Sequence, residues 1–334
     1  MINLTAQPRI DSLNALRGMA ALAVCWFHLV HFNPWIENGV LRMSGAYGSL
    51  GVDVFFVISG CVIPYALHRS NYQISYYGRF LIKRLLRLCP PYWVTIALVV
   101  CVGYLSICVP SFKGEPFHVF ARQVLLNLTY TADIFSDQWF IYVFWTLAIE
   151  IQYYLLVGLV FFAIAAPHGS IRMAAFALLG ALAFLLPSKA FVFHYLFLFI
   201  LGILTFQHLA SIIRMKSYLC LLGLCACGLF FTLGWPATIV GVATSCVITF
   251  LSLNNRLLQF FGDISYSVYL LHLAIYPKVF NLTMRVMSGE TGITVSLILS
   301  LGLTIAAAYG LYRLVEIPAQ RWSSSVRYTH RKVG

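Results

Sequence analysis

Long apolar runs separated by short polar stretches make up most of the 334-residue chain. A helix needs about 20 apolar residues to cross a bilayer, and ten runs approach that length. Because the runs are continuous and do not alternate every second residue, they favour helices over a β-barrel. The pattern predicts an all-α polytopic membrane protein with about ten transmembrane helices. We expect them near residues 13–33, 49–68, 91–109, 140–165, 171–187, 190–208, 218–234, 235–252, 264–284 and 292–315.

The composition agrees with this fold class. Hydrophobic residues make up 61% of the chain and charged residues 10%, against about 25% charged in an average soluble domain. Too few charges remain to solvate a soluble surface, which excludes a cytosolic enzyme, a disordered chain and a secreted disulfide scaffold. The nine cysteines lie in or beside apolar runs without a C-x-x-C pair, so we interpret them as small buried hydrophobes. The polar first 17 residues are not a cleavable signal peptide.

Basic residues predict the orientation. With the N-terminus inside, cytoplasmic segments hold 16 of the 22 Lys and Arg residues and external segments hold 6. This positive-inside bias places both termini in the cytoplasm and accounts for the net charge of +12 without nucleic acid. We expect a cytoplasmic basic loop at 69–90 and an external loop at 110–139. Residues 1–334 are expected to form a single membrane domain, with no appended soluble domain.

Two ionisable residues of the first run, Arg17 and His28, are the first candidates for function. An ionisable side chain at mid-bilayer costs about 2.5–3.5 kcal/mol and therefore marks a functional position by default. Eleven residues of α-helix make about three turns plus 20°, so both side chains face the same way, roughly 16 Å apart along the axis. A membrane anchor and a hydrogen-bonded core histidine are the structural alternatives. His31, one turn further out, is interpreted as an interfacial histidine.

Glu150 is the second candidate. Its run enters from outside near Phe140, which places Glu150 roughly 15 Å from the external face. Gln152, Tyr153 and Tyr154 add polar atoms in the same turn. A carboxylate at this depth needs a partner, and a histidine on a neighbouring helix would serve, although purely structural pairing is an alternative.

The second run contributes polar and small residues. Asp53 is expected near its external end, and Ser59 and Gly60 lie deeper. Small residues commonly mark close helix packing, which is one interpretation of this pair. Ser59 is not proposed as a nucleophile, because the sequence places no base beside it.

The cytoplasmic loop carries a basic helical face. Arg79, Lys83, Arg84 and Arg87 lie at i, i+4, i+5 and i+8, and leucines supply an apolar surface. The pattern predicts an interfacial helix that ends at the proline pair 90–91. This helix is either a membrane anchor or a polyphosphate site, since guanidinium groups bind phosphate in a bidentate manner.

The order of these residues resembles the membrane-bound acyltransferase 3 family, the acyltransferases of bacterial surface carbohydrates. Arg17 and His28 match its Arg-x10-His motif, and residues 55–60 (FFVISG) match its Phe-Phe-x-x-Ser-Gly element. Residues 83–90 (KRLLRLCP) resemble its Arg-Arg-x-x-Arg…Pro loop. Lys83 replaces the first arginine of that loop, which keeps the charge but loses the planar fork.

Three later segments extend the resemblance over nearly the whole chain. Residues 145–150 (WTLAIE) resemble a Trp-Ser-Leu-x-x-Glu motif, with Thr146 in place of serine. Residues 262–272 (GDISYSVYLLH) resemble a late signature, and residues 316–318 (EIP) a terminal one. Each motif is weak alone, but six in the same order are specific.

The resemblance implies transfer of an acyl group, usually acetyl, from cytoplasmic acetyl-CoA or another acyl-CoA to a sugar hydroxyl. The expected partners are acyl-CoA, a carbohydrate or lipid-linked glycan acceptor, and membrane lipid, with no nucleic acid and no metal. The expected location is the bacterial cytoplasmic (inner) membrane. The residues expected to bind the donor are Arg17, Lys83, Arg84 and Arg87. The residues expected to support substrate or structure are Asp53, Ser59, Gly60, Trp145, Tyr266 and His272.

General-base catalysis is the expected mechanism. Desolvation disfavours the imidazolium cation, so neutral His28 can take the proton of the attacking sugar hydroxyl. Glu150 would orient His28 or stabilise the imidazolium, as the third member of a triad does. A covalent acyl-histidine stays open, and His272 is either a further polar ligand or structural.

A transporter or flippase for a lipid-linked glycan or small molecule is the alternative function, because buried charges and a basic loop suit it too. The sequence shows neither repeated halves nor paired broken helices. Release of free thiol from acyl-CoA separates the two functions.

Overall fold

The computed structural model describes residues 11–37, 39–107 and 118–328, and every regular element in these ranges is helical. The chain forms two compact units. The described part of the first unit comprises residues 11–32, 39–72 and 160–266, and that of the second comprises 33–37, 73–159 and 267–328. The expectation that residues 1–334 act as a single membrane domain stays a prediction.

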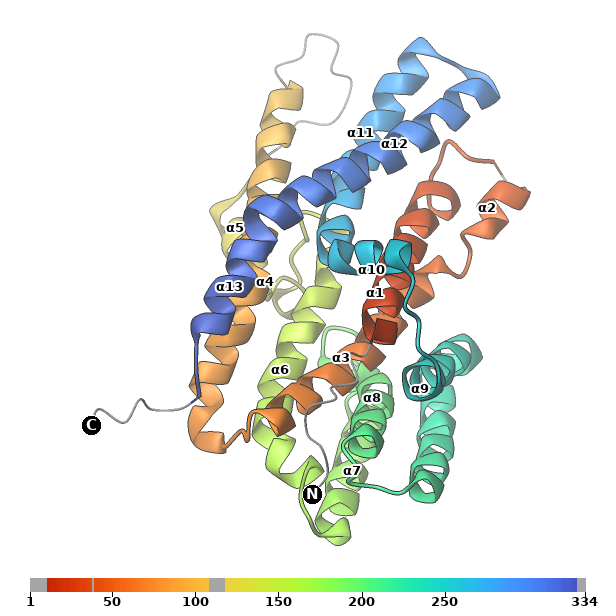
Figure 1. Cartoon of the computed structure of the whole chain (residues 1–334). Coiled ribbons are helices and arrows are strands. Elements are labelled where there is room, and N and C mark those ends of the chain that lie inside the picture. The colour runs from red at the N-terminus through yellow and green to blue at the C-terminus, as the bar shows by residue number, and fades with distance from the viewer. Residues whose placement is uncertain (1–10, 38, 108–117, 329–334) are drawn as a thin grey trace. The chain divides into compact units, whose positions relative to one another are not determined.

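The first unit is built around α8 (Leu196–Leu209), in which every residue from Leu196 to Gln207 is buried. A helix that is apolar on all sides belongs inside a bundle. The other helices of this unit are α1 (Asp11–Trp26), which continues as a π-helical turn (Phe27–His31), α2 (Val40–Ser44), α3 (Gly51–Arg69), α7 (Gly169–Leu185), α9 (Met215–Phe250) and α10 (Arg256–Asp263), with 3-10 turns at Gly48–Leu50 and Val192–Tyr195 (Figure 1).

Two glycines let α3 and α8 approach closely. A Cβ atom on Gly60 would lie 2.3 Å from the backbone oxygen of Phe199, and one on Gly202 would lie 2.1 Å from that of Val57. Only glycine fits at either position without moving a backbone. The interpretation of Gly60 as a close-packing residue is thus supported by the contact it makes.

The second unit contains α4 (Tyr77–Ile107), α5 (Ala121–Leu128), α6 (Trp145–Ile164), α11 (Ser265–Val286), α12 (Gly289–Leu311) and α13 (Ile317–Ser325). Residues 160–164 of α6 and 265–266 of α11 belong to the first unit. A π-helical turn (Tyr312–Glu316) joins α12 to α13, and 3-10 turns lie at Ile74–Tyr76, Asp133–Phe135 and Tyr142–Phe144. α13 runs alongside α4 (Figure 1), where Ser323 Oγ donates a hydrogen bond to the Lys83 carbonyl at 2.7 Å.

Seven helical segments of the described chain are long and apolar enough to cross a membrane: Ser12–His31, Val40–Arg69, Ile74–Ile107, Tyr142–Ile164, Val192–Leu209, Met215–Phe250 and Gly289–Ser325. Each of the ten expected runs overlaps a helix. The run at 171–187 corresponds to the shorter α7, and the run at 264–284 to α11. The runs at 218–234 and 235–252 are merged in α9, which kinks at Gly234 with φ 82°, a conformation that glycine adopts readily. The all-helical class is confirmed, while the count of ten stays a prediction.

The expected end of the basic helix at prolines 90–91 is wrong, while its place at the membrane interface stays a prediction. α4 runs unbroken from Tyr77 to Ile107 and carries both prolines in its interior. Each proline removes one backbone hydrogen bond, but helices of membrane proteins tolerate this where side chains or neighbours satisfy the freed groups. The basic face at 79–87 is therefore the first part of a long apolar helix. The first part of the expected external loop at 110–139 lies outside the described residues, and the rest includes α5.

Candidate active site

His28 lies in the π-helical turn that ends the first helix. The turn is closed by a hydrogen bond from Phe32 N to the Phe27 carbonyl at 3.0 Å. Such turns are rare and frequently occur at functional sites. The His28 side chain is buried and meets the rings of Phe27 and Phe32 edge-on, at centroid distances of 5.0 and 6.3 Å. The local backbone and two aromatic rings therefore hold the imidazole.

The hydrogen bond of His28 fixes its tautomer. Nδ1 lies 2.9 Å from the Val24 carbonyl oxygen, and a carbonyl oxygen only accepts hydrogen bonds. Nδ1 therefore carries hydrogen, and in the neutral ring Nε2 is the basic nitrogen. Arg17 lies in the regular part of α1, and only the last steps between it and His28 fall in the π turn. Most of the rotation expected for a shared face is retained.

A second face of α1 packs against α10. Asn14 Nδ2 donates to Gln259 Oε1 at 3.0 Å and to Asp263 Oδ1 at 2.8 Å. A Cβ on Gly262 would lie 2.2 Å from the Asn14 carbonyl oxygen. The start of the late signature thus supports the helix that carries Arg17 and His28. Sequence reasoning missed Asn14, although an asparagine one turn before Arg17 in an apolar run was the available signal.

The remaining candidate residues of the first unit lie at helix starts or at a helix crossing. Asp53 lies in the first turn of α3, where the helix macrodipole favours a carboxylate. Ser59, half-buried, precedes Gly60 at the crossing with α8. Tyr266 is buried at the start of α11.

In the second unit, half-buried Glu150 and the buried residues Tyr154 and Arg84 form a cluster. The Tyr154 hydroxyl donates to Glu150 Oε1 at 2.5 Å. The Arg84 guanidinium carbon lies 5.8 Å from the centroid of the Tyr154 ring and 5.6 Å from that of Phe80, within the range of cation–π attraction. Arg84 is only 8% exposed, and its Nε has no hydrogen-bond partner within the described residues. A donor held in a dry site in this way is suited to an anionic ligand.

Around Arg84, the basic face of α4 meets the end of the described chain. Lys83 Nζ lies 5.5 Å from the centroid of the Tyr328 ring, and an Arg79 guanidinium nitrogen donates to the Tyr328 carbonyl at 3.2 Å. Burial raises the pKa of the Tyr328 phenol, and the Arg84 charge acts in the opposite direction. Arg87 is half-buried on the same helix. Four cations thus gather on one stretch of α4, with Tyr328 packed against two of them.

The segment that begins at Trp145 is tied to the late signature. Thr146 Oγ1 and the Tyr269 hydroxyl lie 2.7 Å apart, and the same hydroxyl donates to the Val143 carbonyl at 3.2 Å. His272 is fully buried, and its Nδ1 lies 2.8 Å from the Tyr269 carbonyl. Threonine in place of serine therefore still supplies the hydroxyl that this contact uses.

The terminal segment is joined to the late signature as well. Glu316 is buried and accepts hydrogen bonds from Ser267 Oγ at 2.8 Å and from Gln320 Nε2 at 3.1 Å. Segments that lie about 50 residues apart in the sequence thus meet through one carboxylate.

A family model described as an acyltransferase domain matches residues 10–313. The chain belongs to the acyltransferase 3 family. Two relatives are similar to part of the chain. The peptidoglycan O-acetyltransferase OatA of Listeria monocytogenes is 30% identical over 156 residues, and the putative peptidoglycan O-acetyltransferase YrhL of Bacillus subtilis is 28% identical over 166. Each alignment covers 44% of this chain but 23% of the relative. No solved structure matches the chain.

The candidate site residues divide between the two units. The first unit holds Arg17, His28, Asp53, Ser59, Gly60 and Tyr266, and the second holds Lys83, Arg84, Arg87, Trp145, Glu150 and His272. The pairing of His28 with Glu150 stays a prediction, because the two residues belong to different units. Within the second unit, the structure brings Arg84 and Glu150 into contact with the same residue, Tyr154. Sequence reasoning named Tyr154 but gave it no role, although its i+4 spacing from Glu150 was the available signal.

Proposed function

We propose that this acyltransferase is an integral membrane O-acetyltransferase. It moves an acetyl group from cytoplasmic acetyl-CoA to a sugar hydroxyl of a surface or lipid-linked glycan, with His28 as general base. The observation that carries the proposal is the tautomer of His28: its Nδ1 hydrogen is engaged by Val24, so Nε2 is the nitrogen that takes a proton. The names of the two relatives make a peptidoglycan sugar the first acceptor to test.

In this mechanism the sugar hydroxyl oxygen attacks the thioester carbonyl carbon while His28 Nε2 takes the hydroxyl proton. The carbon–sulfur bond then breaks, and the proton passes to the leaving thiolate, which leaves as CoA thiol. Glu150 orients the His28 ring or stabilises its imidazolium form, and the Tyr154 hydroxyl holds the Glu150 carboxylate. An acyl-histidine intermediate is the alternative route.

The donor site is proposed on the basic stretch of α4. The CoA nucleotide carries phosphates, which guanidinium and ammonium groups bind. Arg84 supports this assignment best, because its buried Nε lacks a partner within the described residues. Lys83 and Arg87 flank it, and Arg17 adds a further cation. Ten membrane spans with both termini in the bacterial cytoplasm would place these residues on the side where acetyl-CoA is made.

The test uses the full chain in proteoliposomes with acetyl-CoA and a peptidoglycan fragment. Thiol release is followed with a chromogenic thiol reagent, and acetylation of the fragment by mass spectrometry. His28→Ala is expected to lower both rates by about 10²- to 10⁴-fold, the usual contribution of a general base. His31→Ala, a histidine of the same turn, is the matched control and is expected to keep its activity. Wild-type rates in a correctly inserted His28→Ala protein would overturn the assignment.

Binding of the donor is tested separately. Arg87→Gln is expected to raise the KM for acetyl-CoA more than it lowers kcat, because a phosphate remote from the reacting carbon is bound equally in ground and transition states. An unchanged KM would make the basic stretch an anchor only. Absence of acetyl-CoA-dependent thiol release from the wild type would favour a transporter of lipid-linked glycans.

A further inference from the structure

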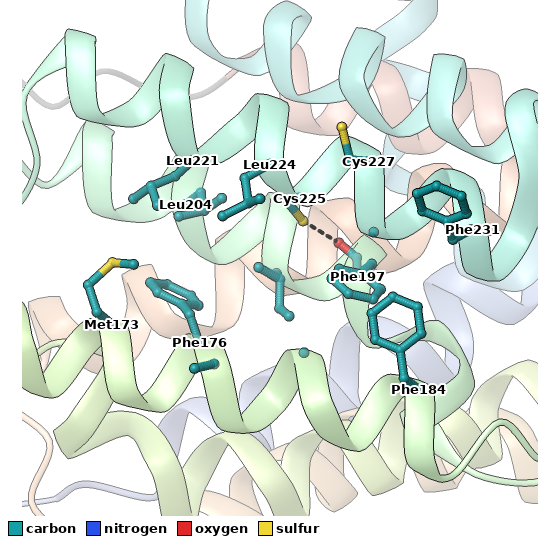
Figure 2. Close-up of a pocket in the computed structure, with 14 residues that line it drawn as sticks. Met173, Phe176, Phe184, Phe197, Leu204, Leu221, Leu224, Cys225, Cys227 and Phe231 are labelled. Atoms are coloured by element: carbon teal, nitrogen blue, oxygen red, sulfur yellow. Dashed lines mark hydrogen bonds between the residues drawn. The ribbon is translucent and has the colours of Figure 1, made fainter.

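An apolar groove lies in the first unit between α7, α8 and α9. Its lining residues are distant in the sequence from His28 and Arg17. It encloses about 390 Å³. Figure 2 shows Phe176 of α7 across the open space from Leu221 and Leu224 of α9, and Phe184 of α7 beside Phe197 of α8. Its lining is almost entirely carbon. A groove of this chemistry fits a hydrocarbon chain.

Small residues keep the groove open. A Cβ on Gly228 would lie 2.4 Å from the Phe197 ring, and Ala177 and Gly180 line the α7 wall. On the other side, Cys225 Sγ donates to the Phe197 carbonyl at 3.4 Å, which ties α9 to α8 (Figure 2). The width of the groove is thus set by side chains that are packed or hydrogen-bonded.

The groove continues into a polar cavity of about 300 Å³. Met173, Phe176 and Leu221 line both spaces. The polar cavity also contains Arg172 and Arg214. The two spaces therefore form one site with an apolar arm and a cationic end.

Two helix N-termini add to the positive potential of that end. Gly169, the first residue of α7, and Ser217, in the first turn of α9, both line the polar cavity. Neither helix has a side-chain cap or an acidic residue in its first turn. Their leading backbone N–H groups and the positive ends of their macrodipoles suit a phosphate.

Arg172 and Arg214 stand differently in this cavity. Arg172 Nη1 donates to the carbonyls of Ala166 and Pro167, at 2.5 and 3.0 Å, which holds its guanidinium beside the start of α7. Arg214 is exposed at the N-cap of α9. A fixed guanidinium and a solvent-facing one provide an anchor and an entry for an anion.

Gln207 is the independent sign of a ligand. Its side chain is fully buried and lines the polar cavity. Nε2 donates to the Ile164 carbonyl at 2.6 Å, so the other amide atom is Oε1, which has no hydrogen-bond partner within the described residues. A buried acceptor without a donor is destabilising. A hydroxyl hydrogen of a ligand would satisfy it.

We propose that this site binds an anionic glycerophospholipid with a hydroxylated headgroup, of the phosphatidylglycerol type. The phosphate lies between Arg172 and Arg214 at the two helix N-termini, a headgroup hydroxyl donates to Gln207 Oε1, and one acyl chain occupies the groove. A free anion would leave the groove empty, and a zwitterionic lipid such as phosphatidylcholine would bring a choline cation in place of the hydroxyl that Gln207 Oε1 accepts from. The site is independent of the proposed acetyl transfer and would stand if that proposal failed.

The experiment uses the full chain, purified in detergent and stripped of lipid, with native mass spectrometry as the readout. Dioleoylphosphatidylglycerol and dioleoylphosphatidylcholine are titrated separately, and inorganic phosphate is added as a competitor. We expect phosphatidylglycerol to bind at least fivefold more tightly than phosphatidylcholine. Millimolar phosphate is expected to displace little of it, because phosphate lacks the acyl chain. Equal binding of both lipids, or full displacement by phosphate, would overturn the proposal.

Three variants test the two arms of the site. Arg214→Gln removes the exposed guanidinium and is expected to weaken phosphatidylglycerol binding about tenfold, as loss of a charge-assisted hydrogen bond does. Ala177→Trp fills the groove and is expected to weaken both lipids. Lys216→Gln removes a charge at the same helix end but does not line either space, so its affinity should match the wild type. Wild-type affinity in Arg214→Gln, or equal losses in Arg214→Gln and Lys216→Gln, would refute the headgroup assignment.

Discussion

The crossing of α3 and α8 gives the most direct quantitative prediction, because one atom decides it. Gly202→Ala would place a Cβ 2.1 Å from the Val57 carbonyl oxygen and 2.7 Å from Cys61 N. These are backbone atoms of a buried helix and cannot rotate away. A carbon and a carbonyl oxygen settle at about 3.3 Å, so the two helices must separate locally by about 1.2 Å. Such overpacking typically costs about 1–3 kcal/mol.

Gly302→Ala is the matched control. Gly302 also lies inside a helix, α12, and its Cβ would meet nothing within 4 Å. Both substitutions gain about 1 kcal/mol of helix propensity, so their difference isolates the clash. The free energy of unfolding of Gly202→Ala should therefore lie about 1–3 kcal/mol below that of Gly302→Ala. At about 2 °C per kcal/mol for a chain of this size, the difference in Tm is roughly 2–6 °C.

The assay is thermal unfolding of the two variants and the wild type in one detergent, followed by circular dichroism and by loss of monodispersity on gel filtration. Gly302→Ala should melt at or slightly above the wild type. If Gly202→Ala melted as high as Gly302→Ala, then α3 and α8 would not be in backbone contact at this point. The structural role given to Gly60, which lies at the same crossing, would fall with it.

Two further predictions concern the catalytic proposal. One alanine inserted after Ala21 rotates His28 by about 100° relative to the start of α1, so thiol release should fall to the level of the His28→Ala variant. A four-residue insertion gives a net rotation of about 40° and should recover part of the activity. Full activity in the one-residue insertion would show that the shared face of Arg17 and His28 is incidental. Tyr154→Phe removes the donor to Glu150 Oε1, and loss of a charge-assisted hydrogen bond of about 1.5–3 kcal/mol should lower kcat about 10- to 150-fold. The control variant Tyr142→Phe, at an exposed tyrosine, should leave kcat unchanged. Equal rates in the two variants would remove Tyr154 from the mechanism.

The sequence by itself determined which long apolar segments are helical. In lipid, every backbone polar group must be satisfied within the segment, so an apolar run of sufficient length becomes a helix whatever its neighbours do. By the same local rule, Arg17 and His28, which are eleven residues apart, were predicted to lie on one helix. The spacing of residues in the motifs was enough to indicate the family before any contact was known.

Tertiary structure decided what depends on partners far apart in the chain. The continuation of α4 through Pro90 and Pro91 could not be read from proline alone, because its cost depends on what satisfies the freed carbonyls. The local pattern of apolar residues predicts a helix but does not distinguish an α-helix from a π turn, because the same apolar residues suit both. The π turn at His28 was therefore seen only in the three-dimensional structure.

The chemistry of individual side chains also came from packing. Arg84 reads as one of four cations on a helical face, and only its burial against Tyr154 separates it from Lys83 and Arg87. Gln207 reads as an ordinary polar residue near a helix end. Only the structure shows that its Nε2 donates to the Ile164 carbonyl, some 40 residues earlier, and that its Oε1 has no donor within the described residues. Sequence periodicity reports the face on which a residue lies, whereas burial and hydrogen bonding depend on which other segment covers that face.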